Sequence, residues 1–412
     1  MNVPRFTASD RTATVIAGVA GQISPAQSAA GPQRLDSIDL LRGLVIVLMA
    51  LDHTRDFFGT SGANPRDVAE PALFLTRWIT HFCAPVFIFL AGVSAYLYGA
   101  RGRSVGALSR FLLTRGLWLI LIEFTVVRLG WSFSLNITHF TGQVIWAIGA
   151  SMVVLAGLVY LPRWAIAAVG LVMIAGHNLF DGIAAEQFGP AGFIWNLLHK
   201  PGPLWASDET RLFVLYPLIP WVGVMAAGYA LGPVMQLDAA ARRHWLLGLG
   251  LALTAGFIVL RATNLYGDPA GWDGHDGALA TALSFVNCEK YPPSLLYLMM
   301  TLGPALVLLA TFPNANARGR VAACLITFGR VPFFFYVVHI FLIHALAVVF
   351  AAVAFGDASW LFGSFCGKPG GYGVSLAGVY GVWLCVVIAL YPPCRWFAAL
   401  KQRRREWWWS YL

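Results

Sequence analysis

Long apolar segments recur from one end of this sequence to the other. Hydrophobic residues make up 58% of the 412 residues and charged residues only 11%, whereas soluble domains carry about 25% charged residues. A helix that crosses a membrane needs about 20 mostly apolar residues. Such segments lie near 39–58, 72–98, 107–127, 143–160, 163–180, 212–232, 244–261, 293–312, 329–353 and 373–393. The sequence therefore predicts an all-α fold, a polytopic membrane helix bundle with about ten transmembrane helices.

The apolar segments divide the chain into three regions. Residues 1–33 have no span-length apolar run and are predicted to form a disordered cytoplasmic tail. Residues 34–395 form the membrane domain. Residues 396–412 combine the basic run Lys401–Arg405 with Trp407–Trp409, a pattern that favours contact with anionic membrane lipids as partners.

The distribution of positive charge predicts the orientation of the chain. With ten spans, 19 of the 28 Lys and Arg residues lie in the termini and connections of one side. Cytoplasmic connections carry the excess of positive charge. We therefore expect a multi-pass membrane protein with both termini in the cytoplasm. The cations are dispersed over short loops, so nucleic-acid binding is not predicted.

The long connections fall on the opposite, outer side, at roughly 59–71, 128–142, 181–211, 262–292 and 354–372. Long ordered loops are usually functional, so the outer face is the predicted place for recognition of a substrate. Cys288 and Cys366 are the two cysteines of these loops, and we expect them to lie close together, within about 7 Å between Cα atoms if they form a disulfide.

The first span ends in the sequence Asp52-His53-Thr54-Arg55-Asp56. Ionisable groups inside a membrane are costly and usually functional. His53 lies about 21 Å along a helix that begins at residue 39, near the outer interface. It can act as a general base. Asp56, one turn away, or the adjacent Asp52 is predicted to orient it. Asp52 points about 100° away around the helix, so a second histidine or a cation is the alternative partner for it. The alternative is an interfacial histidine hydrated by water.

Four further ionisable groups lie inside predicted spans. His81 is expected at the depth of His53 and is a second catalytic candidate, with a hydrogen-bonded core histidine as the equal alternative. His339 and His344 are five residues apart and point to different sides of one helix. With Glu123, they are candidates for contact with a substrate. Glu123 needs a partner, either a histidine or Arg128. The acids and histidines of the first three spans lack the spacing of metal ligands, so no metal is predicted.

The outer connection 262–292 is rich in polar and aromatic side chains. Asn264, Tyr266, Asp268, Lys290 and Tyr291 together suit a polar, hydroxylated ligand such as a sugar. The alternative is a loop that uses these residues for ordinary turns.

Two arginines lie at the predicted cytoplasmic ends of the first and ninth spans, Arg42 and Arg330. Arginine binds phosphates with bidentate geometry, so these side chains are candidates for binding a phosphorylated cofactor. They also fit the simpler role of positive anchors at the cytoplasmic face.

Several motifs follow one another along residues 34–395. The first is Arg34-x-x-Ser37-x-Asp39-x-x-Arg42-Gly43, followed by an apolar run and Asp52-His53. The others are Pro85–Gly92, Asn264–Pro269, Lys290–Ser294, Thr301–Pro304 and Gly329–His339. In this order they resemble the motifs of the heparan-alpha-glucosaminide N-acetyltransferase-like membrane proteins of bacteria, which implies a location in a bacterial inner membrane.

The resemblance implies a transmembrane acyltransferase fold, related to the acyltransferase-3 proteins, that takes acetyl groups from cytoplasmic acetyl-CoA. His53 matches the catalytic histidine of the acyltransferase-3 proteins by position. The glucosaminide enzyme carries its catalytic histidine in the loop after this helix. Here Gly59–Pro71 contains no histidine and has Asn64 near that place. This difference favours His53 as the base and leaves the acceptor open.

The predicted function is transfer of an acetyl or other acyl group from cytoplasmic acyl-CoA to a hydroxyl or amino group of a sugar-like acceptor at the outer face. Direct transfer and transfer through an acyl-histidine both stay open, as does the oligomeric state, with a homodimer as one alternative. The rival prediction is a proton-coupled transporter of a small polar solute, built on the same ionisable groups. A non-enzymatic partner of a cell-envelope assembly is the third.

Overall fold

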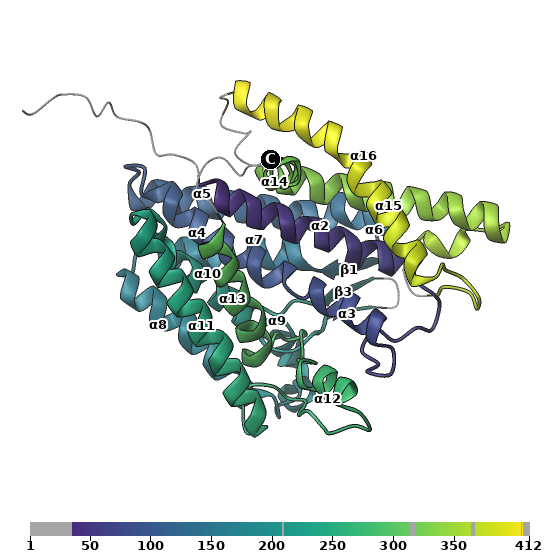
Figure 1. The fold of residues 1–412 in the computed structure, drawn as a ribbon, viewed down its shortest axis with the longest axis horizontal. Coiled ribbons are helices and arrows are strands. Elements are labelled where there is room, and N and C mark those ends of the chain that lie inside the picture. The colour runs from purple at the N-terminus through teal and green to yellow at the C-terminus, as the bar shows by residue number, and fades with distance from the viewer. Residues whose placement is uncertain (1–34, 208–209, 313–318, 364–366, 405, 407–412) are drawn as a thin grey trace, which may run out of the picture. The chain divides into compact units, whose positions relative to one another are not determined.

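The computed structural model describes residues 35–207, 210–312, 319–363, 367–404 and 406 (Figure 1). The α-helices are α2 (Asp36–Phe58), α3 (Pro71–Thr80), α4 (Cys83–Gly99), α5 (Val105–Ile122), α6 (Arg128–Ser132), α7 (Val144–Leu158), α8 (Arg163–Gly176), α9 (Gly192–Leu198), α10 (Leu218–Leu231), α11 (Ala239–Thr263), α12 (Ala278–Phe285), α13 (Leu295–Thr311), α14 (Arg320–Arg330), α15 (Pro332–Phe355) and α16 (Leu376–Arg403). Short 3₁₀ or π segments are η1 (Glu123–Val127), η2 (His177–Phe180), η3 (Ala185–Ala191), η4 (Gly232–Gln236) and η5 (Ser359–Leu361). The strands are β1 (His139–Gly142), β2 (Gly202–Ala206) and β3 (Arg211–Val214).

Two sequence predictions fall on parts that the structure does not describe. The tail at 1–33 lies outside the described residues, and so does Cys366. Cys288 is buried. The expected proximity of the two cysteines therefore stays a prediction.

Each of the ten predicted spans contains a helix. By length and composition, seven helical segments of the described chain can cross a membrane, and the apolar helices α7 and α13 are shorter. Helix α2 is 23 residues long but carries charges at both ends, so it is not among the seven. The helical membrane bundle is confirmed, while the count of ten spans stays a prediction.

Four boundaries differ from the predicted ones. The span at 72–98 is two helices, α3 and α4, separated at His81 and Phe82. The segment predicted to start at residue 212 begins as strand β3, and its helix starts at Leu218. The amphipathic helix α14 was not predicted, and Val331 separates it from α15. Helix α16 continues to Arg403, through the first part of the predicted C-terminal tail.

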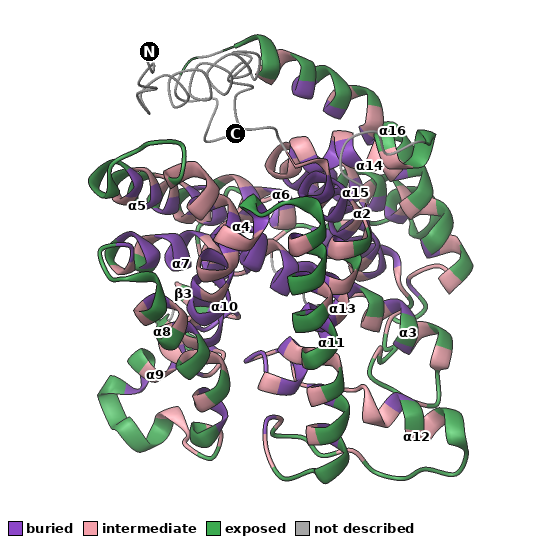
Figure 2. Ribbon diagram, turned by 60° about the vertical axis from the view of Figure 1, so that its left-hand side comes forward, coloured by how far each residue is buried: buried purple, intermediate pink, exposed green. Residues whose placement is uncertain are grey.

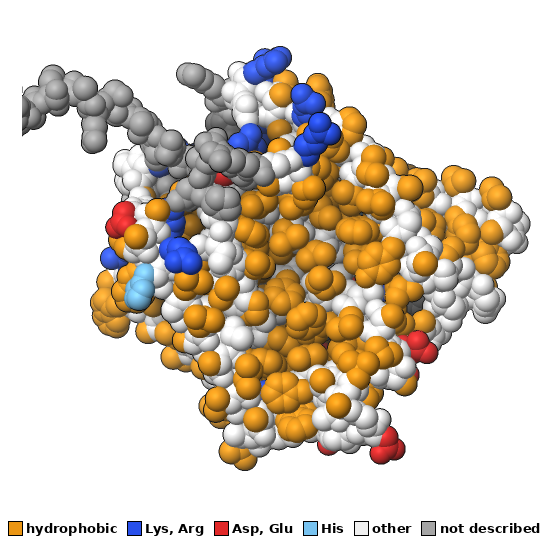
Figure 3. Space-filling model, in the orientation of Figure 1, with side chains coloured by type: hydrophobic (Ala, Val, Ile, Leu, Met, Phe, Trp, Pro, Cys, Tyr) orange, Lys and Arg blue, Asp and Glu red, His pale blue; other side chains and the backbone are white. Residues whose placement is uncertain are grey.

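The outward faces of the long helices are apolar. Exposed large hydrophobic residues include Leu171 on α8, Val259 on α11, Val353 on α15 and Ile388 on α16, and Figure 2 shows buried residues gathered on the central helices. In Figure 3 a broad apolar belt is almost free of charged side chains, and Lys and Arg gather at the end of the face near the C-terminal part of α16. The apolar belt is suited to contact lipid tails, and the positively charged end is suited to the membrane–water interface.

Helix α2 packs against α4, α14, α15 and α16, and Figure 1 shows it between these helices. Its contact with α14 is a backbone contact. A Cβ on Gly43 would overlap the carbonyl oxygen of Leu325, and a Cβ on Gly329 would overlap that of Asp39. Small residues let membrane helices approach this closely. The two glycines beside Arg42 and Arg330 therefore have a packing role.

A three-stranded sheet in the order β1-β3-β2 connects two loops that are predicted to lie on the outer side. Strand β1 lies parallel to β3, with His139 opposite Arg211, and β2 lies antiparallel to β3. The sheet is a small addition to the predicted all-α architecture. It fixes the connection that precedes α7 to the connection that precedes α10.

Candidate active site

The central feature of the candidate site is a hydrogen bond between two buried histidines, His53 on α2 and His339 on α15. Nδ1 of His53 lies 2.7 Å from Nε2 of His339. The two rings are stacked, with centroids 4.9 Å apart and an angle of 15° between their planes. His339 is fully buried and His53 is 9% exposed. The sequence predicted both residues as functional, but it did not predict their contact.

The hydrogen bonds determine where the protons of this pair lie. Nδ1 of His339 is 3.0 Å from the carbonyl oxygen of Phe335. A carbonyl can only accept, so His339 carries its proton on Nδ1 and, when neutral, presents a lone pair at Nε2. His53 must then donate its Nδ1 proton to that lone pair. Nε2 of His53 is left with a lone pair and, within the described part of the chain, makes no hydrogen bond. It is the basic atom of the pair.

Aromatic rings enclose His53. Trp131 of α6 meets its ring edge to face at a centroid distance of 4.9 Å, and Tyr336 of α15 does so at 6.1 Å. Phe57, one turn after His53, stacks on Trp131 at 5.4 Å. These aromatic rings restrict the rotamers of the His53 imidazole and limit the access of water to it. Trp131 was not predicted, because it follows the third span in sequence and reaches His53 only through the packing of α6.

The two carboxylates beside His53 pair with an arginine. Arg55 Nη2 lies 2.7 Å from Oδ1 of Asp52 and 2.9 Å from Oδ1 of Asp56. The prediction that Asp52 or Asp56 orients His53 is wrong, because Nδ1 of His53 bonds to His339. The alternative that Asp52 pairs with a cation is confirmed by Arg55. Both carboxylates still act on His53 electrostatically.

His81 lies between the end of α3 and the start of α4, and it is 4% exposed. Its carbonyl accepts a hydrogen bond from the Tyr297 hydroxyl at 2.7 Å. Neither ring nitrogen of His81 has a hydrogen-bond partner among the described residues. The charges of Asp52, Arg55 and Lys290 act on both His81 and His53. The two histidines therefore share one charged environment, although the structure records no contact between their rings. Their equal depth in the membrane stays a prediction.

Glu123 has a partner that was not predicted. Its Oε2 accepts a hydrogen bond from the backbone N–H of Trp146 at 2.8 Å, in the first turn of α7. The first amides of a helix have no partner within the helix, and its N-terminus favours negative charge. The expectation that a histidine or Arg128 pairs with Glu123 is therefore wrong. Arg128 donates to the carbonyls of Ser134 and His139 instead.

His344 connects three parts of the chain. Its Nδ1 lies 2.8 Å from the carbonyl oxygen of Gly130, and its Nε2 lies 2.9 Å from that of Leu361. The ring stacks on Phe133 at a centroid distance of 3.8 Å. Both ring nitrogens are occupied by backbone groups, so the predicted contact of His344 with a substrate has no free atom to make it.

The polar residues of the outer connection mostly bind its own backbone. Asn264 holds Trp272 through both its amide atoms, and the Tyr266 hydroxyl donates to the carbonyl of Ala175. Asp268 accepts from the Ser294 hydroxyl at 2.6 Å, and burial raises its pKa. The alternative of ordinary loop residues fits these three better than the predicted sugar site.

Lys290 and Tyr291 lie closer to the histidines. Lys290 is 6% exposed, and its ammonium lies 5.2 Å from the centre of the Tyr291 ring. Burial alone would lower the pKa of Lys290, but Tyr291 and Asp52 hold it above its ordinary value. The Tyr291 hydroxyl lies 3.5 Å from that of Tyr216. Lys290 thus brings a positive charge to the end of α2 that carries His53.

The two arginines predicted to bind a cofactor have acidic partners. Arg330 lies 3.4 Å from Asp36 and 3.9 Å from Asp39, and Arg42 lies 3.7 Å from Asp39. Arg42 also donates to the Ser94 hydroxyl on α4. Their side chains keep 19% exposure at Arg42 and 33% at Arg330. The arginines thus meet at one end of α2, each partly open to the surroundings.

Comparison with known families decides the identity. The family described as "Heparan-alpha-glucosaminide N-acetyltransferase, catalytic" matches residues 34–259, which is more than half of the chain. The protein belongs to this family. The match includes α2 with Arg42 and His53 and implies a membrane protein with transferase activity. His339 lies beyond the matched residues. No curated protein matches the chain.

Proposed function

We propose that this protein transfers an acetyl group from acetyl-CoA at the cytoplasmic face to an amino or hydroxyl group of a sugar-like acceptor at the outer face, with His53 as the general base. The hydrogen-bond chain from His53 through His339 to Phe335 carries the proposal, because it leaves a lone pair on Nε2 of His53. The family match supports acyl transfer as the reaction.

In the proposed reaction, Nε2 of His53 takes the proton of the acceptor as the acceptor nitrogen or oxygen bonds to the acyl carbon. The carbon–sulfur bond of the thioester then breaks. The CoA sulfur leaves as a thiolate and takes the proton from Nε2. An acyl-His53 intermediate is the second route: Nε2 attacks the thioester carbon and releases the CoA thiolate. The acceptor then attacks the acyl carbon and displaces Nε2, and its proton goes to the thiolate. Both routes need the same protonation state of His53 at the start.

The surroundings of His53 suit the imidazolium that forms during proton transfer. Nδ1–H keeps its acceptor on His339 throughout, so no hydrogen bond has to break. The carboxylates of Asp52 and Asp56 are near enough to stabilise the positive charge, although Arg55 neutralises part of their effect. The rings of Trp131 and Tyr336 limit competing hydrolysis by excluding water.

The proposed orientation follows from the excess of Lys and Arg on one side. It places Arg42 and Arg330 at the cytoplasmic mouth, where the phosphates of CoA enter, and His53 toward the outer end of α2. A periplasmic reporter fused after Leu412 is expected to be inactive. Activity of that reporter only outside the cytoplasm would contradict the orientation.

The test of function is labelled acetyl transfer by the purified protein from acetyl-CoA to glucosamine and to its methyl glycoside. We expect acceptor-dependent release of CoA by the wild type and a loss of at least about 100-fold in His53→Ala, since a general base typically contributes 10²–10⁴-fold. His275→Ala is the matched control, because His275 is an exposed histidine. An unchanged melting temperature of His53→Ala would separate lost chemistry from lost folding.

Two results would contradict the proposal. The first is full transferase activity in His53→Ala, after which His81 would be the next base to test. The second is transport of a polar solute by the wild type in vesicles with no release of CoA, which would favour the proton-coupled transporter.

A further inference from the structure

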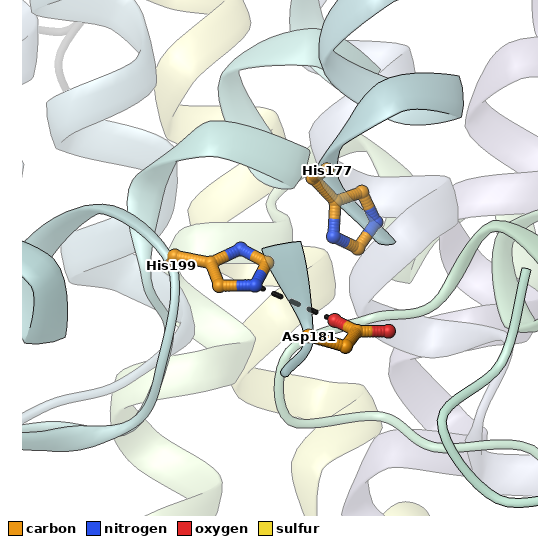
Figure 4. Close-up of side chains that lie close together, drawn as sticks. All are labelled: His177, Asp181 and His199. Carbon is orange, nitrogen blue, oxygen red and sulfur yellow. Dashed lines mark ion pairs between the residues drawn. The ribbon is translucent and has the colours of Figure 1, made fainter. Parts of the chain in front are cut away.

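A second group of ionisable side chains lies away from the His53–His339 pair. His177 begins η2 at the end of α8, Asp181 follows η2, and His199 follows α9. Figure 4 shows the three side chains facing one another. One ligand atom from each lies within 4.8 Å of the corresponding atom of the others. These two histidines and one carboxylate have no part in the proposed acyl transfer.

The two histidines are buried without well-formed hydrogen bonds. His177 is 2% exposed and His199 is 0% exposed. Within the described residues, none of their four ring nitrogens has a hydrogen-bond partner of good geometry. A buried polar group without a partner is destabilising, and native proteins contain few of them. Two adjacent imidazoles in this state indicate that a partner of another kind belongs between them.

The carboxylate is held in place by a chain of hydrogen bonds from a different helix. Asn178 Nδ2 donates to Oδ2 of Asp181 at 2.7 Å, and Oδ1 of Asn178 accepts from the backbone N–H of Leu295 at 2.9 Å. This leaves Oδ1 of Asp181 directed at His199. The backbone carbonyl of Pro293 lies near the ring of His177 without forming a hydrogen bond of good geometry. Supporting contacts of this kind orient the ligands of metal sites.

We propose that His177, Asp181 and His199 bind a divalent transition-metal ion, with Zn²⁺ as the best-suited ion. Two imidazoles and one carboxylate are a common set of three protein ligands for zinc, with water in the fourth position. Ligand atoms bound to zinc in a tetrahedron at about 2.0–2.1 Å lie about 3.3 Å apart.

The distances fit this geometry. Nε2 of His199 and Oδ1 of Asp181 are 3.4 Å apart, which is close to the tetrahedral spacing. The ligand atom of His177 lies within 4.8 Å of the other two ligand atoms. Bound metal would connect the end of α8 to the end of α9 and so fix the connection that leads into strand β2.

The experiment uses the full chain purified in detergent with an affinity tag that contains no histidine. After treatment with a chelator, the protein is loaded with Zn²⁺, passed through gel filtration, and analysed for metal by mass spectrometry. We expect about one zinc per chain in the wild type. His199→Ala and the nearly isosteric Asp181→Asn should each lower the bound zinc by at least about tenfold. His275→Ala, which removes an exposed histidine, should keep it.

Substitution with Co²⁺ gives a second measurement that needs no variant. A wild-type absorption spectrum typical of tetrahedral nitrogen and oxygen ligands is expected, and Zn²⁺ should abolish it. Less than about a tenth of a zinc per chain in the wild type would overturn the proposal, as would equal zinc in wild type and variants, or a cobalt spectrum of the hydrated octahedral ion. All of these readouts are independent of transferase activity.

Discussion

The protonation pattern of the histidine pair makes a sharp prediction for His339→Phe. Phenylalanine keeps a planar ring of similar shape but removes the acceptor of the Nδ1 proton of His53. Leaving that N–H buried and unpaired costs about 1–3 kcal/mol. His53 avoids this cost by moving its proton to Nε2, which is the atom that the reaction needs as a base. The productive tautomer then becomes rarer by the same free energy, or about 5- to 150-fold.

The expected result is a fall in kcat of that size, smaller than the loss in His53→Ala, with little change in KM for acetyl-CoA. His339→Gln is the matched control, because the Gln carbonyl oxygen can accept the Nδ1 proton. We expect it to recover most of the activity. The assay is acceptor-dependent release of CoA at saturating donor, with the melting temperature of each variant measured in parallel.

The pattern of the two variants is what tests the argument. If His339→Phe and His339→Gln lose activity equally, a merely structural role of His339 explains the loss. If His339→Phe keeps full kcat, Nε2 of His53 is not the base. A change confined to KM would mean that His339 contacts the substrate and does not act through His53.

Three other regions give predictions of their own. Gly43→Leu should lower the melting temperature strongly, because the backbones of α2 and α14 are in contact at Gly43. Gly248→Ala, at an open position of α11, should not lower it. Equal melting temperatures of the two variants would contradict the close packing. Glu123→Ala should cost about 1–3 kcal/mol of stability, because it leaves the backbone N–H of Trp146 without its acceptor. An unchanged denaturation midpoint would show that this hydrogen bond does not stabilise the fold. Arg42→Ala and Arg330→Ala should each weaken CoA binding more than they lower the melting temperature, and unchanged CoA affinity in both would leave them as topology anchors.

The helical segments were predictable because each is a local property of the sequence. About 20 apolar residues must form a helix in a membrane, so hydropathy alone locates them. The boundaries that failed depend on longer-range structure. Strand β3 was assigned to a span because its residues are apolar, but β1 and β2 pair with it. Helix α14 is too short for a span, and its packing against α2 is what stabilises it.

The site was predictable in its residues and not in its bonds. His53 and His339 stand out as ionisable groups in apolar spans, but 286 positions separate them, and only the packing of α2 against α15 brings them together. The nearest acids in sequence were the natural guess for a partner. Arg55, which lies between those acids in sequence, takes both of them.

The group at His177 was missed for a different reason. Its only local signal is the spacing of four between His177 and Asp181, which places them on one side of a helical turn. The third member, His199, comes from the end of a separate helix. A spacing of four between histidine and aspartate is common, so it gains meaning only from the burial of the side chains.

Helix α2 has the geometry to serve both ends of the proposed reaction. Arg42 and His53 are eleven residues apart, so they lie about 16 Å apart along the axis and only about 20° apart around it. A donor whose phosphates contact Arg42 can therefore extend along one side of the helix toward His53. The other neighbours of α2 differ at its two ends, with Ser94 of α4 at Arg42 and His339 of α15 at His53. Donor binding and base catalysis can thus be altered separately, and Arg42→Ala should change the affinity for CoA without the loss of kcat expected for His339→Phe.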